Sequence, residues 1–143
     1  MPIMTTACPC GGASYAACCA RFIDGSALPP DAATLMRSRY SAYVLRNEAY
    51  LRATWQAGTC PLDAILSDDE GLHWLGLEVK SALRIRQSTG PADADQDSVE
   101  FVARYKIKGR AYRLHEVSRF VREDGRWLYV DGSFPAAGKN KTR

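Results

Sequence analysis

The sequence predicts an α+β fold in which a short cysteine-rich element precedes one domain of helices and an antiparallel sheet. Three observations support this prediction. Four of the five cysteines fall within residues 8–19, apolar residues recur at helical spacing between residues 31 and 55, and extended segments follow from residue 74. Helices that come first and strands that come second favour separate layers, with the helices packed on one curved face of the sheet.

The first long helix is predicted to begin after Asp31, because an aspartate that follows two prolines is a good N-cap. Its apolar stripe consists of Met36, Tyr40, Tyr43 and Val44. Asn47 ends this register, and residues 48–55 form a second helix. A short third helix is expected to begin at Pro61.

Four strands are predicted after the helices. The first runs from residue 74 to residue 86, and the second covers residues 99–106, with Phe101, Ala103 and Tyr105 on the face toward the helices. Residues 108–110 form a tight connection to the third strand, residues 112–122. An Asp-Gly step at residues 124–125 then predicts a hairpin into the last strand.

The length of the chain indicates one domain, and its net charge does not favour a dedicated nucleic-acid binder. The chain has 143 residues, of which 46% are hydrophobic, and this is enough for a core. The net charge is only +3, and Lys139, Lys141 and Arg143 supply much of the excess. Without a basic stripe that neutralises many phosphates, we expect no nucleic-acid partner.

The N-terminal segment predicts a cytoplasmic location. Residues 1–7 lack the cationic region and the apolar run of a secretory signal, and no apolar stretch of about 18 residues is available to span a membrane. We therefore expect a reducing compartment and no membrane association. Disulfides are rare there, and clustered cysteines more often hold a metal or carry out chemistry.

The cysteine cluster predicts a zinc site. Cys8, Cys10, Cys18 and Cys19 form two close pairs joined by a turn that contains glycines, so four thiolates can meet at one point in the tetrahedral arrangement that zinc prefers. Four protein ligands leave no position for a catalytic water, which favours a structural or adhesive role. Two disulfides, or free thiols in an apolar plug, are the alternatives. Cys60 stands alone and is interpreted as a packed, inert thiol.

Several sequence strings resemble a known family. The cysteine string CPCGGASYAACC (residues 8–19) resembles the SEC-C metal-binding motif. Further strings match, in order, the YchJ-like family of uncharacterised bacterial proteins: residues 35–43, 74–77, 101–105, 115–120 and 127–132. This resemblance implies a cone-shaped nuclear transport factor 2-like (cystatin-like) domain and a bound metal, but no reaction. The loop of seven residues between Cys10 and Cys18 is one residue shorter than in the usual motif.

The predicted domain boundaries follow these patterns. Residues 1–23 form the zinc knuckle, residues 24–30 a linker rich in turn formers, residues 31–134 the cone domain, and residues 135–143 a flexible basic tail.

A second candidate site lies in the cone domain, because domains of this kind commonly enclose a pocket. Strand alternation places Glu116 and Ser118 on one face with two apolar residues, and Arg39 borders the buried stripe of the first helix. We expect Glu116 to point inward and to pair with Arg39 rather than Arg37. Together with Asp131 at the end of the last strand, these residues form a speculative ligand site. The alternative is a structural salt-bridge network.

Two functions are therefore expected. The first is a non-catalytic binding or adaptor protein, with the zinc knuckle making protein contacts. The second is an enzyme or small-molecule carrier that uses the pocket near Arg39, Glu116 and Asp131. The oligomeric state stays open.

Overall fold

In the part of the chain that the structure describes, four antiparallel strands form one meander and three helices precede them, which confirms the predicted α+β class. The computed structural model describes residues 7–63, 65–66, 72–84 and 96–134. The helices are α1 (Ala20–Ile23), α2 (Ala32–Leu45) and α3 (Glu48–Ala53). The strands are β1 (Leu72–Arg84), β2 (Gln96–Ile107), β3 (Arg110–Glu123) and β4 (Arg126–Ser133), in the order β1-β2-β3-β4. In the described part of the chain, no helix is long and apolar enough to cross a membrane.

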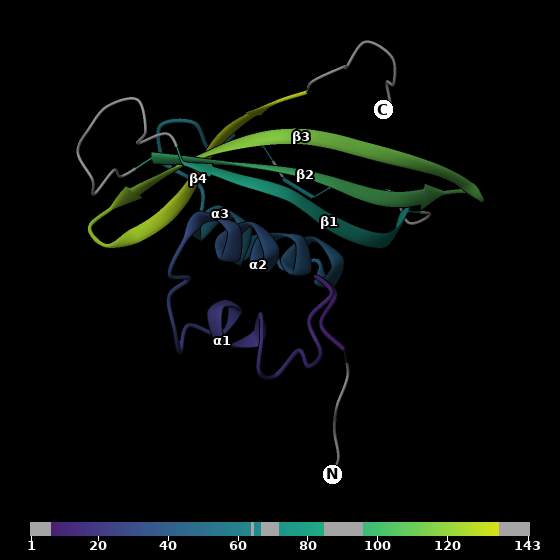
Figure 1. Ribbon diagram of the computed structural model, residues 1–143, viewed down its shortest axis with the longest axis horizontal. Coiled ribbons are helices and arrows are strands. Elements are labelled where there is room, and N and C mark those ends of the chain that lie inside the picture. The colour runs from purple at the N-terminus through teal and green to yellow at the C-terminus, as the bar shows by residue number, and fades with distance from the viewer. Residues whose placement is uncertain (1–6, 64, 67–71, 85–95, 135–143) are drawn as a thin grey trace.

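Figure 1 shows three layers, with α2 between the sheet on one side and the N-terminal cysteine element on the other. The cysteine element and α1 contact the side of α2 that faces away from the sheet. None of the described helices lies on the other side of the sheet. This arrangement explains why α2 is buried on two sides.

The N-terminus of α2 is capped as predicted, because the Asp31 carboxylate accepts a hydrogen bond from the Thr34 amide at 2.8 Å. Met36 and Tyr40 are buried, and the Tyr40 ring packs edge-on against Trp74 of β1 at 5.6 Å. The predicted stripe is therefore confirmed. Ser38 and Ser41 are fully buried as well, which the single stripe did not predict.

Asn47 caps α3 through a hydrogen bond from the Tyr50 amide, as predicted. The short helix expected at Pro61 is wrong for the described residues 61–63 and 65–66. Side chains of α3 bind the backbone there instead. Arg52 donates to the carbonyl oxygens of Pro61 and Asp63, and Glu48 accepts from the amide of Ile65. These hydrogen bonds satisfy backbone carbonyl and amide groups that would otherwise be paired within a helix.

The predicted hairpins and the inward face of β2 are confirmed. Lys108 and Gly109 both have positive φ, as do Asp124 and Gly125, and a two-residue turn that matches the twist of the strands requires this. Phe101 and Ala103 are buried between the sheet and α2, and the Tyr105 ring packs against the Trp74 ring. Residues 85–86, at the predicted end of the first strand, lie outside the described residues.

The cysteine element belongs to the same core as the sheet. Cys8, Cys10 and Cys19 lie in one buried cluster with Tyr40 of α2 and Phe101 of β2. The knuckle and the cone domain therefore share buried apolar surface, and we expect their unfolding to be coupled.

Candidate metal centre and buried polar cluster

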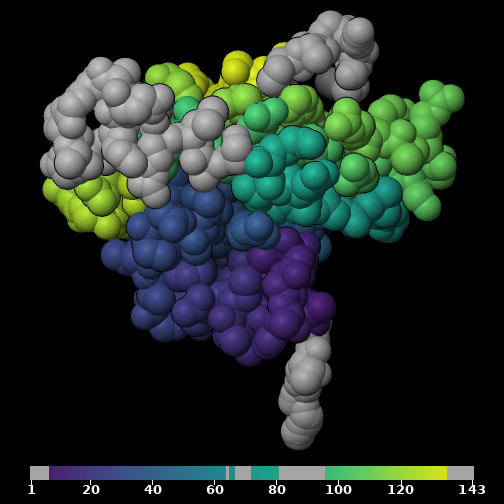
Figure 2. Space-filling view, viewed as in Figure 1, coloured from purple at the N-terminus to yellow at the C-terminus, as the bar shows by residue number. Residues whose placement is uncertain are grey.

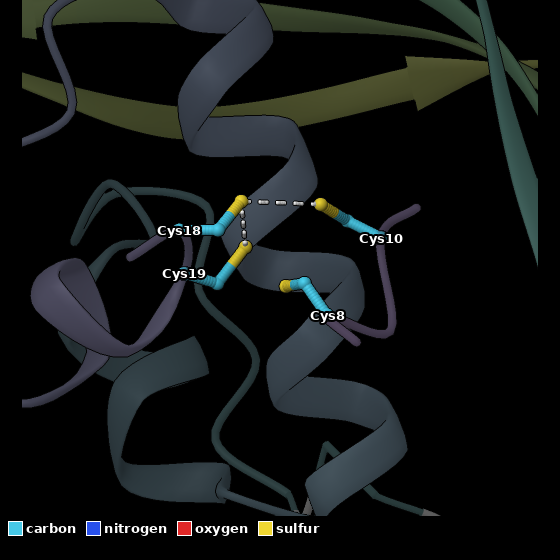
Figure 3. A group of neighbouring side chains, drawn as sticks. All are labelled: Cys8, Cys10, Cys18 and Cys19. Carbon is cyan, nitrogen blue, oxygen red and sulfur yellow. Dashed lines mark hydrogen bonds between the residues drawn. The ribbon is translucent and has the colours of Figure 1, made fainter. Parts of the chain in front are cut away.

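Two turns bring the four cysteine side chains together beside α2. The Gly11 amide donates to the Cys8 carbonyl at 2.9 Å, and the Cys8 amide donates to the Gly12 carbonyl at 3.0 Å, so the first pair sits on a tight turn. Cys19 is the residue before α1, which places the second pair at the start of that helix. Figure 3 shows the four side chains converging from these two segments.

The distances between the sulfur atoms fit a tetrahedral metal site. All four Sγ atoms lie within 4.8 Å of one another. The Cys10–Cys18 distance is 3.6 Å and the Cys18–Cys19 distance is 3.9 Å. Four sulfurs held about 2.3 Å from one zinc ion lie about 3.8 Å apart. None of the five cysteines is joined in a disulfide, so the four clustered thiols are available together as a donor set that fits a divalent metal.

Glycine allows the shortened loop to close. A Cβ on Gly12 would lie 2.9 Å from the Cys18 Sγ, a distance that real Cβ atoms do not reach. Gly11 has a φ of 107°, which residues with a side chain rarely adopt. The loop that is one residue shorter than the usual motif therefore brings its cysteines together by close approach of the backbone.

The thiols strongly influence one another's protonation. A hydrogen bond from Cys19 is the main cause that lowers the pKa of Cys10 to about 4. The same hydrogen bond, with burial, raises the pKa of Cys19, and burial raises the pKa of Cys18 to about 11. The Cys10 thiol therefore ionises readily, whereas the Cys18 and Cys19 thiols resist ionisation. A bound divalent cation removes this resistance, since it stabilises several thiolates at once.

Helix α2 supplies polar contacts to the cluster. The Ser41 hydroxyl lies 3.4 Å from the Cys8 Sγ, and Arg37 donates to the Cys10 carbonyl at 3.2 Å. Neither contact was predicted from the sequence. The sequence did contain a signal for these contacts, namely a set of polar residues on α2 opposite the apolar stripe. In the structure these residues form a second packing face of α2 and do not face solvent.

Glu116 points inward as predicted and is 8% exposed. Its carboxylate accepts hydrogen bonds from the Ser118 hydroxyl at 2.8 Å and from the Tyr129 hydroxyl at 2.9 Å. The backbone of Gly132 in β4 packs closely against the Glu116 carboxylate. A Cβ added at residue 132 would overlap the carboxylate and would lie 2.6 Å from the Glu116 Cδ. Burial raises the pKa of Glu116 above its ordinary value.

The expected ion pair between Arg39 and Glu116 is wrong, since no nitrogen of Arg39 lies within 4.0 Å of a Glu116 oxygen. Arg39 is 3% exposed and donates instead to the Leu51 carbonyl at 2.9 Å and to the Thr54 hydroxyl at 2.8 Å. Its guanidinium also lies 4.6 Å from the centroid of the Tyr129 ring. Arg39 still acts through space on Glu116, where its charge opposes the rise in pKa.

Asp131 does not join this cluster. Its carboxylate forms a two-pronged ion pair with Arg119, at 2.7 and 2.8 Å, on the exposed side of the sheet. The pairing of β3 with β4 contains a bulge. Arg119 pairs with Asp131 and Phe120 pairs with Tyr129, so Val130 has no paired residue on β3. The extra residue shifts the alternation of β4 and turns Asp131 outward.

A cavity of about 380 Å³ lies away from Glu116. It is lined by residues 22–25 and 27–29 at the end of the knuckle and in the linker, by α3 with its two caps, and by Arg126 and Trp127 at the start of β4. Its walls are mostly apolar, as in small-molecule sites, but they include none of Arg39, Glu116 or Asp131.

Replacing Glu116 by glutamine is expected to flatten the pH dependence of stability above pH 4.5, its ordinary pKa. Because burial raises the folded-state pKa, the folded chain keeps a proton that the unfolded chain has released. The free energy of unfolding of the wild type should therefore fall as the pH rises from 4.5 toward the folded pKa. Urea unfolding at several pH values measures this decline. The exposed Glu123→Gln is the matched control, and equal slopes in all three proteins would contradict the expectation.

Comparison with known families matches most of the chain. The family described as YchJ, middle NTF2-like domain, matches residues 31–132. The UPF0225 protein of Cupriavidus metallidurans is 58% identical over 131 residues, which cover 87% of this chain and 86% of that protein. The UPF0225 protein of Methylibium petroleiphilum is 56% identical over 134 residues, which cover 92% of both chains.

Two solved structures share the fold. The solution structure of a SEC-C motif containing protein from Rhodopseudomonas palustris has a TM-score of 0.74 and 27% identity, and covers 90% of this chain and 98% of that one. The crystal structure of a SEC-C motif containing protein from Psychrobacter arcticus has a TM-score of 0.69 and 25% identity, and covers 96% of this chain and 85% of that one. The predicted fold and the resemblance to the SEC-C motif are confirmed.

Proposed function

The chain belongs to the YchJ-like UPF0225 family, and from this premise we propose that it is a cytoplasmic zinc-binding protein with a non-catalytic binding or adaptor role. The observation that carries the proposal is the convergence of four free thiols within 4.8 Å. Both related structures are those of proteins that contain a SEC-C motif. Free thiols are the expected state of cysteines in a reducing compartment.

The surroundings of the cluster favour a structural metal over a catalytic one. Cys8, Cys10 and Cys19 are each less than 5% exposed. Four thiolate ligands complete the tetrahedral coordination of zinc and leave no position for a reacting water. Zinc bound there would join the N-terminal element to α2 and would not activate a substrate.

The exposed surface of the knuckle suits a protein partner. Gly11, Ala13, Ala16 and Ala17 are exposed, and no charged residue occurs between residues 7 and 20. A neutral surface of small side chains lets another chain approach the backbone closely. It offers no cation for a phosphate, so this part of the molecule favours protein contacts.

A carrier or enzyme that uses Arg39, Glu116 and Asp131 is less well supported. Two hydroxyl groups and the backbone at Gly132 enclose the Glu116 carboxylate, and Asp131 lies on the exposed side of the sheet. We therefore assign a structural role to the Arg39–Glu116 cluster. A small-molecule role would have to use the cavity beside Trp127.

Elemental analysis tests the metal assignment. Protein purified under reducing conditions without chelator is expected to hold about one zinc per chain, as one Cys₄ site requires. Cys18→Ser should lose the metal, whereas Cys60→Ser should keep it, because Cys60 lies outside the cluster. Metal-free wild-type protein, or loss of zinc from the Cys60 variant, would show that the assignment is wrong.

A further inference from the structure

The end of the β2–β3 hairpin concentrates positive charge. Residues 104–113 contain five cationic side chains and no acidic one: Arg104, Lys106, Lys108, Arg110 and Arg113. All five are exposed. The hairpin projects beyond the helices, at the right of Figures 1 and 2, so these side chains are presented away from the rest of the domain.

The strand register gathers three of these cations on the face of the sheet opposite to α2. Arg104 pairs directly with Arg113, and Lys106 is two residues from Arg104 on the same strand. Since Ala103 and Tyr105 face α2, the residues between and beside them face the opposite way. Like charges directly opposite each other destabilise a pair of strands. The pairing of Arg104 with Arg113 therefore does not contribute to the stability of the fold.

Little negative charge offsets the cluster. Among the described residues, the acidic group that forms an ion pair with it is Glu78, whose carboxylate lies 3.9 Å from Arg104. Glu78 also lies 3.6 Å from Lys80, and all three side chains are roughly half-exposed. One shared carboxylate leaves most of the positive charge available to a partner.

Aromatic stacking on the other face fixes the geometry of the hairpin. The rings of Tyr105 and Tyr112 stack with centroids 5.4 Å apart and an angle of 19° between their planes. Tyr105 also packs against Trp74 at 5.5 Å. Side chains two residues apart on one strand are about 6.6 Å apart. Arg104 and Lys106 are therefore held at this spacing on a braced ribbon, with Arg113 directly opposite Arg104.

We propose that this hairpin end, defined by the five cations of residues 104–113, binds the phosphodiester backbone of a nucleic acid. Arg104 and Lys106 lie opposite the small residues Gly76 and Ala111, which provide no large apolar anchor, and Leu75 beside Gly76 is the large apolar side chain that is exposed next to them. Protein interfaces depend on such anchors at their centre. A phosphate backbone requires only the cations and the release of its counterions.

This partner differs from the sequence-based expectation. The prediction against a nucleic-acid partner rested on the nearly balanced charge of the whole chain, which hides a local excess. The surface shares no residue with the cysteine cluster. The zinc assignment and the nucleic-acid proposal can therefore fail independently of each other.

Fluorescence anisotropy with labelled single-stranded RNA and duplex DNA tests the proposal. With five phosphate contacts, single-strand affinity should fall about 100-fold between 50 and 200 mM salt. The triple variant Arg104→Gln, Lys106→Gln, Arg113→Gln should bind more weakly and lose only about sevenfold over that range. The two probes show whether the backbone is recognised as a single strand or as a duplex.

The matched control removes the same charge elsewhere, through Lys139→Gln, Lys141→Gln and Arg143→Gln, and should bind like the wild type. Circular dichroism checks that the hairpin variant is folded, which we expect because the change relieves like-charge repulsion. If that variant does not fold, Lys108→Gln with Arg110→Gln tests the turn alone. Absence of binding at 50 mM salt, equal weakening in the control, or equally tight binding of polyglutamate would overturn the proposal.

Discussion

Cys10→Ser is expected to destabilise the whole domain and not only the N-terminal element. Cys10 is 1% exposed and lies in one buried cluster with residues of α2 and β2. Cys10 is one of the four ligands of the zinc site proposed above, so its loss is expected to release the metal and to free the knuckle from α2. The face of α2 that carries Ser38 and Ser41 would become exposed, so part of the core would be lost with the metal.

The expected effect is large. Structural zinc supplies about 10–16 kcal/mol of apparent folding free energy in zinc-finger peptides, whereas a whole domain is stable by about 5–15 kcal/mol. Each kcal/mol shifts the Tm of a domain of this size by about 2–4 °C. We therefore expect the Tm to fall by at least about 10 °C, with loss of the metal.

Thermal unfolding followed by far-ultraviolet circular dichroism and by tryptophan fluorescence measures this effect, because Trp74 and Trp127 both pack in the core outside the knuckle. A chelator added to the wild type should reproduce the change, and Cys60→Ser should not. If the fluorescence transition of Cys10→Ser coincides with that of the wild type, the knuckle is an independent element and our interpretation is wrong.

Gly132→Ala is expected to cost about 3 kcal/mol, because hydrogen bonds to a charged group contribute about 1.5–3 kcal/mol each. The added methyl group would overlap the Glu116 carboxylate, which would have to leave the hydroxyls of Ser118 and Tyr129. Those two donors would then be left unpaired inside the cone. The three atoms nearest to the added methyl group all belong to Glu116, so the substitution acts first on this contact.

A double-mutant cycle provides the control. In a Glu116→Ala background the side chain that blocks the new methyl group is gone, so Gly132→Ala should then cost less than about 1 kcal/mol. Urea unfolding of the four proteins gives the coupling free energy. Equal costs in both backgrounds would mean that the backbone at Gly132, and not Glu116, opposes the substitution.

Local patterns were sufficient for most of the fold. The cap at Asp31, the stripe of Met36 and Tyr40, and the turn at Asp124-Gly125 were predicted correctly because neighbours in the sequence determine them. The cysteine cluster was also predictable, since two close pairs and a glycine turn can converge without help from distant residues. The short helix at Pro61 was wrong because side chains of α3 bind that backbone.

The partners of the buried charges depended on contacts distant in the sequence. Arg39 binds the end of α3 and the Tyr129 ring, whereas Glu116 is satisfied by hydroxyl groups. Periodicity indicates which face a residue occupies, but not which group lies opposite it. A single bulge in β4 was enough to turn Asp131 outward.

By itself the sequence determined the order of the two longer helices and the four strands, the turns, the four-cysteine cluster and the inward direction of Glu116, because these follow from repeats and spacings of a few residues. Only the tertiary structure decided that α2 is buried on two sides, that the knuckle joins the core, and that Arg104 faces Arg113. The physical reason is that each of these features depends on which surfaces meet when distant segments pack together. A local sequence pattern shows which side of an element is apolar, but not which other element packs against it.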